Sequence, residues 1–330
     1  MKTQKRKLDH IRVCLEKDVQ FRKGNGFADY ELRHNALPEM DFSDVDTRMK
    51  FLGREFKAPI FIEAMTGGTS EAEKINRNLA KAAEALGIGM GLGSQRAMIE
   101  DPSLTRTYSV RDVAPSILLL GNIGASQILQ TDAVKIKEAL VATRADGLAV
   151  HLNAAQEIAQ DSGEEKWKGV LESIRVLSSG LGVPVVVKEV GNGIGGDVAK
   201  RLEKAGVAAI DVAGAGGTSW VKVDALITGK SMESFSEWGI PTAQCLEECV
   251  RSVKVPVIAS GGIRNGVDVA KAISMGAFMA GMALPLLRPA TVSAEAVKAR
   301  LEKTIEELRV AMFLSGSRNL AELRGKAFKI

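Results

Sequence analysis

The strongest constraint on the fold is an alternation of short β-rich runs and helical segments that begins at Ala58. Between most runs the apolar residues recur at helical spacing, as they do over residues 71–86. Strands alternating with helices indicate βαβ units and a parallel sheet with right-handed crossovers. Eight units in succession favour an α/β fold closed into a TIM (β/α)8 barrel over an open doubly wound sheet. The predicted strands cover residues 59–65, 87–93, 116–123, 147–152, 183–190, 208–212, 255–259 and 278–284.

The chain before the barrel is polar and shows no regular pattern. We expect residues 1–57 to form an N-terminal extension that packs on the barrel, and residues 58–330 to form the barrel itself. The second helix is interrupted by Asp101-Pro102, and residues 292–314 predict one long closing helix. Residues 218–242 are long for a strand-to-helix connection, which is typical of a functional loop or lid.

The composition is that of an ordinary globular protein. Of its 330 residues, 45% are hydrophobic and 25% are charged, and the net charge of +4 suits an anionic small ligand as well as nucleic acid. Cys14, Cys245 and Cys249 form no paired framework, which favours a reducing, cytoplasmic location. No apolar run approaches the roughly 18–20 residues of a membrane span, and no secretory signal is recognisable, so we expect no membrane partner.

The carboxyl ends of all barrel strands lie on one rim, where ligands bind. A histidine at the end of the fourth predicted strand is followed by two amides and a carboxylate. After the seventh, Gly261-Gly262 allows close approach of the backbone to a ligand, and a helix starting near residues 265–267 points free N–H groups at it. Together with Ala283-Leu284 this predicts a phosphate site, although the glycines could serve tight turns alone. The four polar residues are His151, Asn153, Gln156 and Glu157.

The run GGIRNG followed by DVAKAISMGA resembles the phosphate loop of flavin-mononucleotide (FMN) barrel enzymes. Lys188 lies near the end of a strand otherwise made of valines, and a buried lysine is costly unless it is paired. A cation there can hold negative charge on the N1–C2=O edge of a reduced flavin; the alternative is a purely structural ion pair.

Basic residues in two places suit an anionic ligand. Arg96 follows the second strand, and Arg6-Lys7 with His10 lie in the extension. The planar fork of arginine matches phosphate oxygens, while lysine acts as a point charge. The basic N-terminus could instead be a solvated or nucleic-acid-binding tail, but no aromatic residues are interleaved with it, so we expect no nucleic-acid partner. Glu157 fits Mg²⁺, which typically takes one or two carboxylates, or it interacts with a helix dipole.

The motifs RKLDH, AMTGG, GSQR, HLNAAQE, KEVGNGI, GAGGTSW, GIPTA, SGGIRNG and AGMALP occur in this order. Together they resemble the type 2 isopentenyl-diphosphate isomerases, flavin barrel enzymes that interconvert isopentenyl and dimethylallyl diphosphate. The resemblance covers nearly the whole chain, from Arg6 to Arg318. It implies FMN, Mg²⁺, NADPH or another reductant, and a homo-tetramer or homo-octamer.

Carried over by motif, the resemblance also implies site residues. Glu157 would bind Mg²⁺, and His151 and Asn153 would lie beside flavin and substrate, with Gln156, as catalytic candidates. Ala213 stands where members often have a serine, which puts one hydrogen bond to the flavin phosphate in doubt. The implied FMN contacts are Ala64, Met65, Thr66, Ser94, Asn122, Lys188, Thr218, Gly262, Ile263, Arg264, Ala283 and Leu284, and the implied substrate contacts are Arg6, Lys7, His10, Ser94, Gln95, Arg96 and Gln156.

The reaction so implied is a 1,3-allylic proton transfer without net redox change. Our hypothesis is that reduced FMN is the acid–base group through N5, and that Gln156 positions or relays a proton across the substrate. An FMN-dependent 2-hydroxy-acid dehydrogenase would need a histidine near GAGGTSW, which has none. An inosine-monophosphate-dehydrogenase-like enzyme would need a cysteine after a middle strand, and that is also missing. A non-catalytic flavin-binding sensor would not need the dense polar rim.

Overall fold

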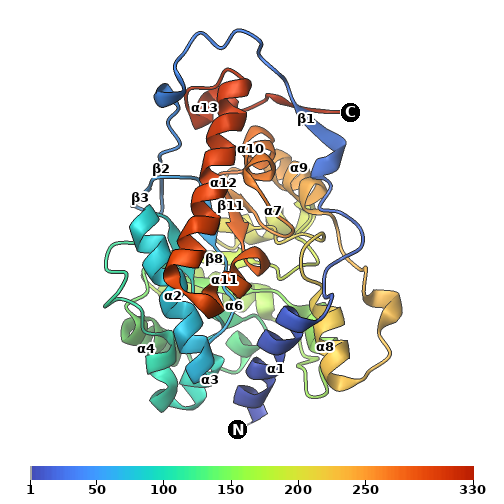
Figure 1. The fold of residues 1–330 in the computed structure, drawn as a ribbon. Helices are drawn as coiled ribbons and strands as arrows, with labels where there is room; N and C mark the ends of the chain where they lie inside the picture. Colours follow the sequence, from blue (N-terminus) through green and yellow to red (C-terminus); the bar gives the residue numbers. More distant parts are fainter. Residues whose placement is uncertain (1) are drawn as a thin grey trace.

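The computed structural model describes residues 2–330, and its centre is a closed barrel of eight parallel strands (Figure 1). The barrel is closed by pairing of the last strand with the first, Ala280 opposite Ile60, which confirms the predicted fold. Each strand is shorter than its predicted run, because the ends of the runs leave the sheet as loops. The strands are β4 (Ile60–Ile62), β5 (Gly89–Gly91), β6 (Leu119–Gly124), β7 (Gly147–His151), β8 (Val185–Lys188), β9 (Ala209–Asp211), β10 (Val257–Ala259) and β11 (Met279–Met282).

Helices follow the strands and bury one face each against the barrel. In α2 (Ser70–Leu86) the Thr69 hydroxyl accepts a hydrogen bond from the Ala72 N–H at 3.1 Å, and Gly87 ends the helix at φ 60°. The other helices of the barrel are α3 (Arg96–Glu100), α4 (Ala133–Thr143), α5 (Ala154–Ala159), α6 (Val170–Gly180), α7 (Gly196–Lys204), α8 (Trp220–Thr228), α9 (Thr242–Ser252), α10 (Gly266–Ser274), α11 (Leu284–Val292), α12 (Ala294–Leu314) and α13 (Leu320–Leu323).

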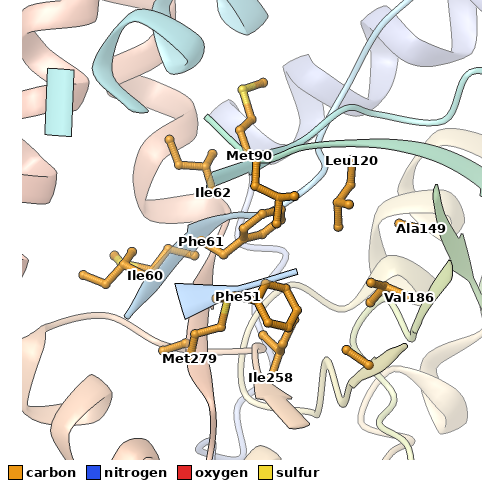
Figure 2. Packing of buried hydrophobic residues seen from close by; sticks show 14 of the residues in the cluster. Phe51, Ile60, Phe61, Ile62, Met90, Leu120, Ala149, Val186, Ile258 and Met279 are labelled. Atoms are coloured by element: carbon orange, nitrogen blue, oxygen red, sulfur yellow. The ribbon is translucent and has the colours of Figure 1, made fainter. Parts of the chain in front are cut away.

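A hairpin closes the amino end of the barrel. It consists of β2 (Met49–Phe51) and β3 (Arg54–Phe56), and both of its phenylalanines are buried. The Phe51 ring lies 5.5 Å from that of Phe278, the residue before β11. Figure 2 shows Phe51 among strand side chains that include Ile258 and Met279. Because this end is filled with apolar side chains, a ligand can enter the barrel only from the carboxyl end of the strands.

The N-terminal segment is more regular than its sequence suggested. Lys2–Glu16 form helix α1, so the expectation of irregular structure is wrong there. Ile11 is buried, and two backbone hydrogen bonds, Phe21 N–H to Gly217 O and Ser219 N–H to Val19 O, fix the chain after the helix to the loop that follows β9. Further on, β1 (Tyr30–Leu32) pairs antiparallel with β12 (Ala327–Lys329). The helix therefore depends on tertiary contacts, which polar composition does not reveal.

One other expectation needs correction, and two are confirmed. The segment 218–242 is not a plain loop, because it contains α8 and the 3-10 turn Glu233–Phe235. The predicted long closing helix over residues 292–314 is confirmed as α12, which begins where the Ser293 hydroxyl accepts from the Ala296 N–H. The interruption at Asp101-Pro102 is confirmed, since α3 ends there and a 3-10 segment (Pro102–Tyr108) begins. No helix among the described residues is both long and apolar enough to cross a membrane.

Arg111 joins the amino ends of β6 and β7. Its buried guanidinium donates to the Ile117 and Arg144 carbonyls and to Asp146 at 2.5 Å, and Asp146 also accepts from the Leu119 N–H. Burial opposes the charge of Asp146, yet these hydrogen bonds hold the pKa of its carboxyl below the usual value.

Replacing Arg111 with methionine should lower the free energy of unfolding by about 3 kcal/mol, because it leaves buried carbonyl acceptors and one carboxylate without their hydrogen-bond donor. Urea unfolding at neutral pH measures the loss. The control is R48M, which breaks an exposed pair with Asp46 and should change stability by less than about 1 kcal/mol. Similar effects of the two variants would contradict the structural role of Arg111.

Candidate active site

One cavity opens at the carboxyl end of the barrel and is partly covered by α1. It brings together residues from the N-terminal helix and from all eight strand ends. Every predicted site residue but one lines it. These are Arg6, Lys7, His10, Ala64, Met65, Thr66, Ser94, Arg96, Asn122, His151, Asn153, Gln156, Glu157, Lys188, Thr218, Gly262, Ile263, Arg264, Ala283 and Leu284.

Gln95 is the exception, and its expected substrate contact is not supported. The side chain is almost fully buried and does not line the cavity. Its amide donates to the Thr143 hydroxyl at 3.1 Å and accepts from the Asn122 N–H at 3.0 Å. Gln95 therefore fastens the end of β6 to α4, while its neighbours Ser94 and Arg96 face the cavity.

The glycine-rich loops after β9 and β10 fit a phosphate group. Gly261 and Gly262 have φ values of 98° and 77°, a region that favours glycine. A Cβ on Gly217 would lie 2.7 Å from the Gly262 nitrogen, so the two loops touch backbone to backbone. Within residues 2–330 the N–H groups of Gly262 and Ile263 have no protein acceptor. These donors, just before α10, are suited to the phosphate of FMN.

A buried ion cluster lies deeper in the cavity. The Lys188 ammonium is 3.4 Å from both Glu63 and Asp211, and all three side chains are buried. Asp211 accepts from the Ser260 hydroxyl at 2.6 Å, while its second oxygen has no hydrogen bond among the described residues. Burial and then the Asp211 charge raise the pKa of Glu63 to about 8. Burial opposes the charge on Lys188, but Asp211 and Glu63 outweigh it and hold its pKa above the ordinary value.

At neutral pH the raised pKa therefore keeps Glu63 largely protonated beside the Lys188 ammonium. Lys188 is paired, as a buried lysine must be, yet its side chain still lines the cavity. Ala213, beside this cluster, has φ 37°, a strained value for a residue with a Cβ.

His151 is a neutral imidazole. Burial, followed by the charges of Lys188 and Lys7, lowers its pKa to about 3. Its Nδ1 lies 2.7 Å from the Asn122 side-chain oxygen, an acceptor, so Nδ1 carries the proton and donates. His151 can thus accept a hydrogen bond through Nε2 but cannot serve as a cationic acid at neutral pH.

The amides and carboxylate after β7 form one buried group. The Asn153 amide donates to Gln156 at 3.2 Å and to Glu157 at 2.9 Å, and the other Glu157 oxygen accepts from the Glu164 N–H. The Asn153 side-chain oxygen is buried and has no hydrogen-bond partner among the residues that the structure describes. In the described part of the chain no three His, Cys, Asp or Glu side chains cluster as a metal site. A cation at Glu157 would need ligand oxygens, which fits Mg²⁺ bound together with phosphate.

Helix α1 carries two cations of the cavity, Arg6 and Lys7, and is held by a hydrogen-bonded chain. Arg6 donates to Gln160 at 2.6 Å, Gln160 donates to Asp224 at 3.3 Å, and His10 lies 2.8 Å from the other Asp224 oxygen. Arg96 forms a half-exposed pair with Glu100 at 2.7 Å. His10 lines the cavity but its Nε2 is already bonded to Asp224.

Sequence reasoning missed several residues of this site. Glu63 had a readable signal, because a carboxylate ends an otherwise apolar run, PIFIEAM. Gln160 and Asp224 had none, since each lies on a separate unit and only the fold joins them to α1.

The profile of the FMN-dependent dehydrogenases matches residues 2–103 and 123–329. An isopentenyl-diphosphate delta-isomerase of Methanothermobacter thermautotrophicus is 49% identical over 322 residues, 97% of this chain and 91% of that protein. One from a Nostoc species is 45% identical, with 98% and 94% covered.

Among solved structures, a mandelate oxidase with (S)-2-phenylpropionate superimposes with a TM-score of 0.67 at 18% identity, covering 98% of this chain and 96% of that one. At this identity the likeness concerns the barrel fold alone.

Replacing Glu63 with glutamine should stabilise the protein increasingly as pH rises from about 4.5 to about 8. The native pKa is raised, so the neutral acid contributes stability that is fully present below the unfolded value and is lost as pH rises through the native one. Glutamine has no proton to lose. Urea unfolding of the flavin-free protein across this range measures the difference, with E306Q as exposed control. A difference that is independent of pH would contradict the raised pKa.

Proposed function

The chain belongs to the isopentenyl-diphosphate delta-isomerase family, and we propose that the cavity at the carboxyl end of its barrel interconverts isopentenyl and dimethylallyl diphosphate with FMN as cofactor. The observation that carries this proposal is the composition of the cavity. A neutral amide, Gln156, lies in one enclosed space with a glycine-rich phosphate loop and with three cations, Arg6, Lys7 and Arg96. Such a site suits a diphosphate and a proton transfer rather than hydride transfer from a hydroxy acid.

FMN would be held by the chain at both of its ends. The free N–H groups of Gly262 and Ile263 would receive its phosphate, and Lys188 would face the pyrimidine edge of its ring. Reduced FMN, when bound, supplies the acid–base group at N5 and an electron-rich ring. Because Lys188 is fixed between Glu63 and Asp211, its charge would be preorganised for a flavin that carries negative charge.

The diphosphate would be bound at the outer end of the cavity. Arg6 and Arg96 present guanidinium groups there, and Glu157 offers one carboxylate to a Mg²⁺ ion that the diphosphate would also bind. Binding energy from this end of the substrate, far from the allylic carbons, holds those carbons in place for proton transfer.

Gln156 would position or relay the proton. Its side-chain oxygen accepts from Asn153, so its NH₂ group is the part left to face a ligand. An amide side chain is uncharged, so it can contact the substrate without placing an unpaired charge in a buried site. His151 supports the arrangement as a neutral acceptor.

The remaining parts of the proposal concern the whole enzyme. NADPH would reduce the flavin, and the protein would act in the cytoplasm, in keeping with three free thiols. Exposed Leu226, Phe235 and Trp238 offer apolar surface for assembly into a homo-tetramer or homo-octamer.

The decisive assay is conversion of isopentenyl diphosphate to the acid-labile allylic diphosphate by purified protein with FMN, Mg²⁺ and NADPH under anaerobic conditions. We expect product that depends on all three additions. Absence of product, with flavin reduced instead by a 2-hydroxy acid, would replace the isomerase by an oxidoreductase.

Replacing Gln156 with asparagine should lower kcat by about 100-fold or more, because the shorter side chain no longer reaches the reacting carbon. FMN affinity, measured by fluorescence titration, should stay within about twofold of the original. Q130N, at an exposed position, is the matched control. Unchanged turnover of Q156N would remove this residue from the mechanism.

Replacing Glu157 with glutamine should raise the Mg²⁺ concentration for half-maximal activity by at least about 10-fold, since the cation loses its carboxylate. Activity at graded Mg²⁺ concentrations measures the effect, while FMN affinity stays unchanged. The exposed E165Q variant should behave like the original protein. Equal Mg²⁺ dependence in all three proteins would rule out Glu157 as the ligand.

A further inference from the structure

Tyr108 lies directly behind the cavity wall without lining it. Its side chain is fully buried, at the end of the 3-10 segment Pro102–Tyr108. A Cβ on Gly67 would be only 2.0 Å from the Tyr108 ring, and one on Gly68 would be 3.3 Å from its hydroxyl. The two glycines after β4 therefore leave the space that the phenol fills.

The backbone that carries Tyr108 is fixed on both sides. The Thr107 hydroxyl accepts from the Gly68 N–H at 2.8 Å, and the buried Asn76 amide donates to the carbonyls of Thr107 and Thr66. The phenol thus has a set position relative to the ends of β4 and β5.

The hydroxyl of Tyr108 forms a closed triangle with two cavity residues. The Lys7 ammonium donates to the Tyr108 hydroxyl at 2.6 Å and to the Ser94 carbonyl at 2.8 Å, and the hydroxyl itself donates to the same carbonyl at 2.8 Å. An ammonium has three N–H donors, and two are engaged here. The third remains for a ligand in the cavity, which Lys7 lines.

We propose that Tyr108 is a positioning residue of this site: its hydroxyl holds the Lys7 ammonium against the Ser94 carbonyl, so that one N–H of Lys7 is aimed at the diphosphate of the substrate. The proposal rests on the proposed function, because it takes the cavity to bind a diphosphate. It deepens that function by naming what orients a cation on a flexible four-carbon stem.

The environment of Lys7 couples the binding of diphosphate to the uptake of a proton. Burial, and then Arg6, lower the pKa of Lys7 to about 7; Glu100 opposes the shift and Arg96 adds to it. Burial raises the pKa of Tyr108, so the phenol stays neutral, and His151 is neutral as well. Near pH 7 part of Lys7 is therefore an uncharged amine. A bound diphosphate favours the ammonium, so binding takes up a proton from solution.

The test compares Y108F with the unchanged enzyme, both loaded with FMN and Mg²⁺. Calorimetric titration with inorganic diphosphate should show an affinity about 10-fold weaker in Y108F, the effect of one hydrogen bond to a charged group. KM for isopentenyl diphosphate should rise by a similar factor, with kcat within about twofold.

A second readout separates positioning from structural support. Repeating the titration near pH 7 in buffers of different ionisation enthalpy gives the number of protons taken up. Uptake should be larger in Y108F, because an amine without its acceptor is less often protonated before the ligand binds.

The matched control is Y30F, which removes the hydroxyl of the other tyrosine of the chain, bonded to Glu247 and absent from the cavity lining. Affinity and proton uptake in Y30F should not change. Unchanged values in Y108F would overturn the proposal, as would a Y108F protein that loses FMN affinity or stability in proportion to diphosphate affinity. The isomerase function is tested separately by the turnover of the unchanged enzyme. The ratio of diphosphate affinities between Y108F and the unchanged enzyme can be measured without any turnover.

Discussion

Closure of the barrel is the constraint on which every other feature of this protein depends. Hydrogen bonds between β11 and β4 join the last strand to the first, which places Glu63 against Gly281 although they are more than half of the chain apart. Because all strands are parallel, their carboxyl ends meet on one rim. The hairpin that carries Phe51 fills the opposite end. Closure thus yields one cavity, open on one side, from residues of eight units.

Charge inside this cavity is balanced by strands that only closure brings together. Lys188 comes from β8, Asp211 from β9 and Glu63 from the end of β4. Each would be costly alone in the barrel, so the three stabilise one another. The outer cations differ: Arg96 is half-exposed, and Lys7 is held by the neutral Tyr108 hydroxyl and Ser94 carbonyl, with its pKa lowered to about 7. The inner charge is therefore fixed, while the outer charge remains available to a ligand.

The sequence predicted the position of most site residues because strand ends carry them. His151 ends β7, residues 153–157 come just after it, and Gly261-Gly262 follow β10. Their place at the carboxyl ends of parallel strands was enough to predict that they meet on one rim. Gln95 does not line the cavity, because one residue of rotation at a strand end turns a side chain from the cavity into the wall. Helix α1 was not predicted, because its stability comes from contacts of residues such as Ile11 and not from an evident periodic pattern.

By itself the sequence determined the eight βα units, the glycine turns of the phosphate loop and the cluster after β7, since local periodicity and residue type specify them. Only the tertiary structure decided which groups have shifted pKa values and which side chains share hydrogen bonds. The Glu63 pKa, the chain from Arg6 to Asp224 and the triangle of Lys7, Tyr108 and Ser94 all join residues that are distant in sequence. Burial and distance set these properties, and both exist only once the barrel has closed.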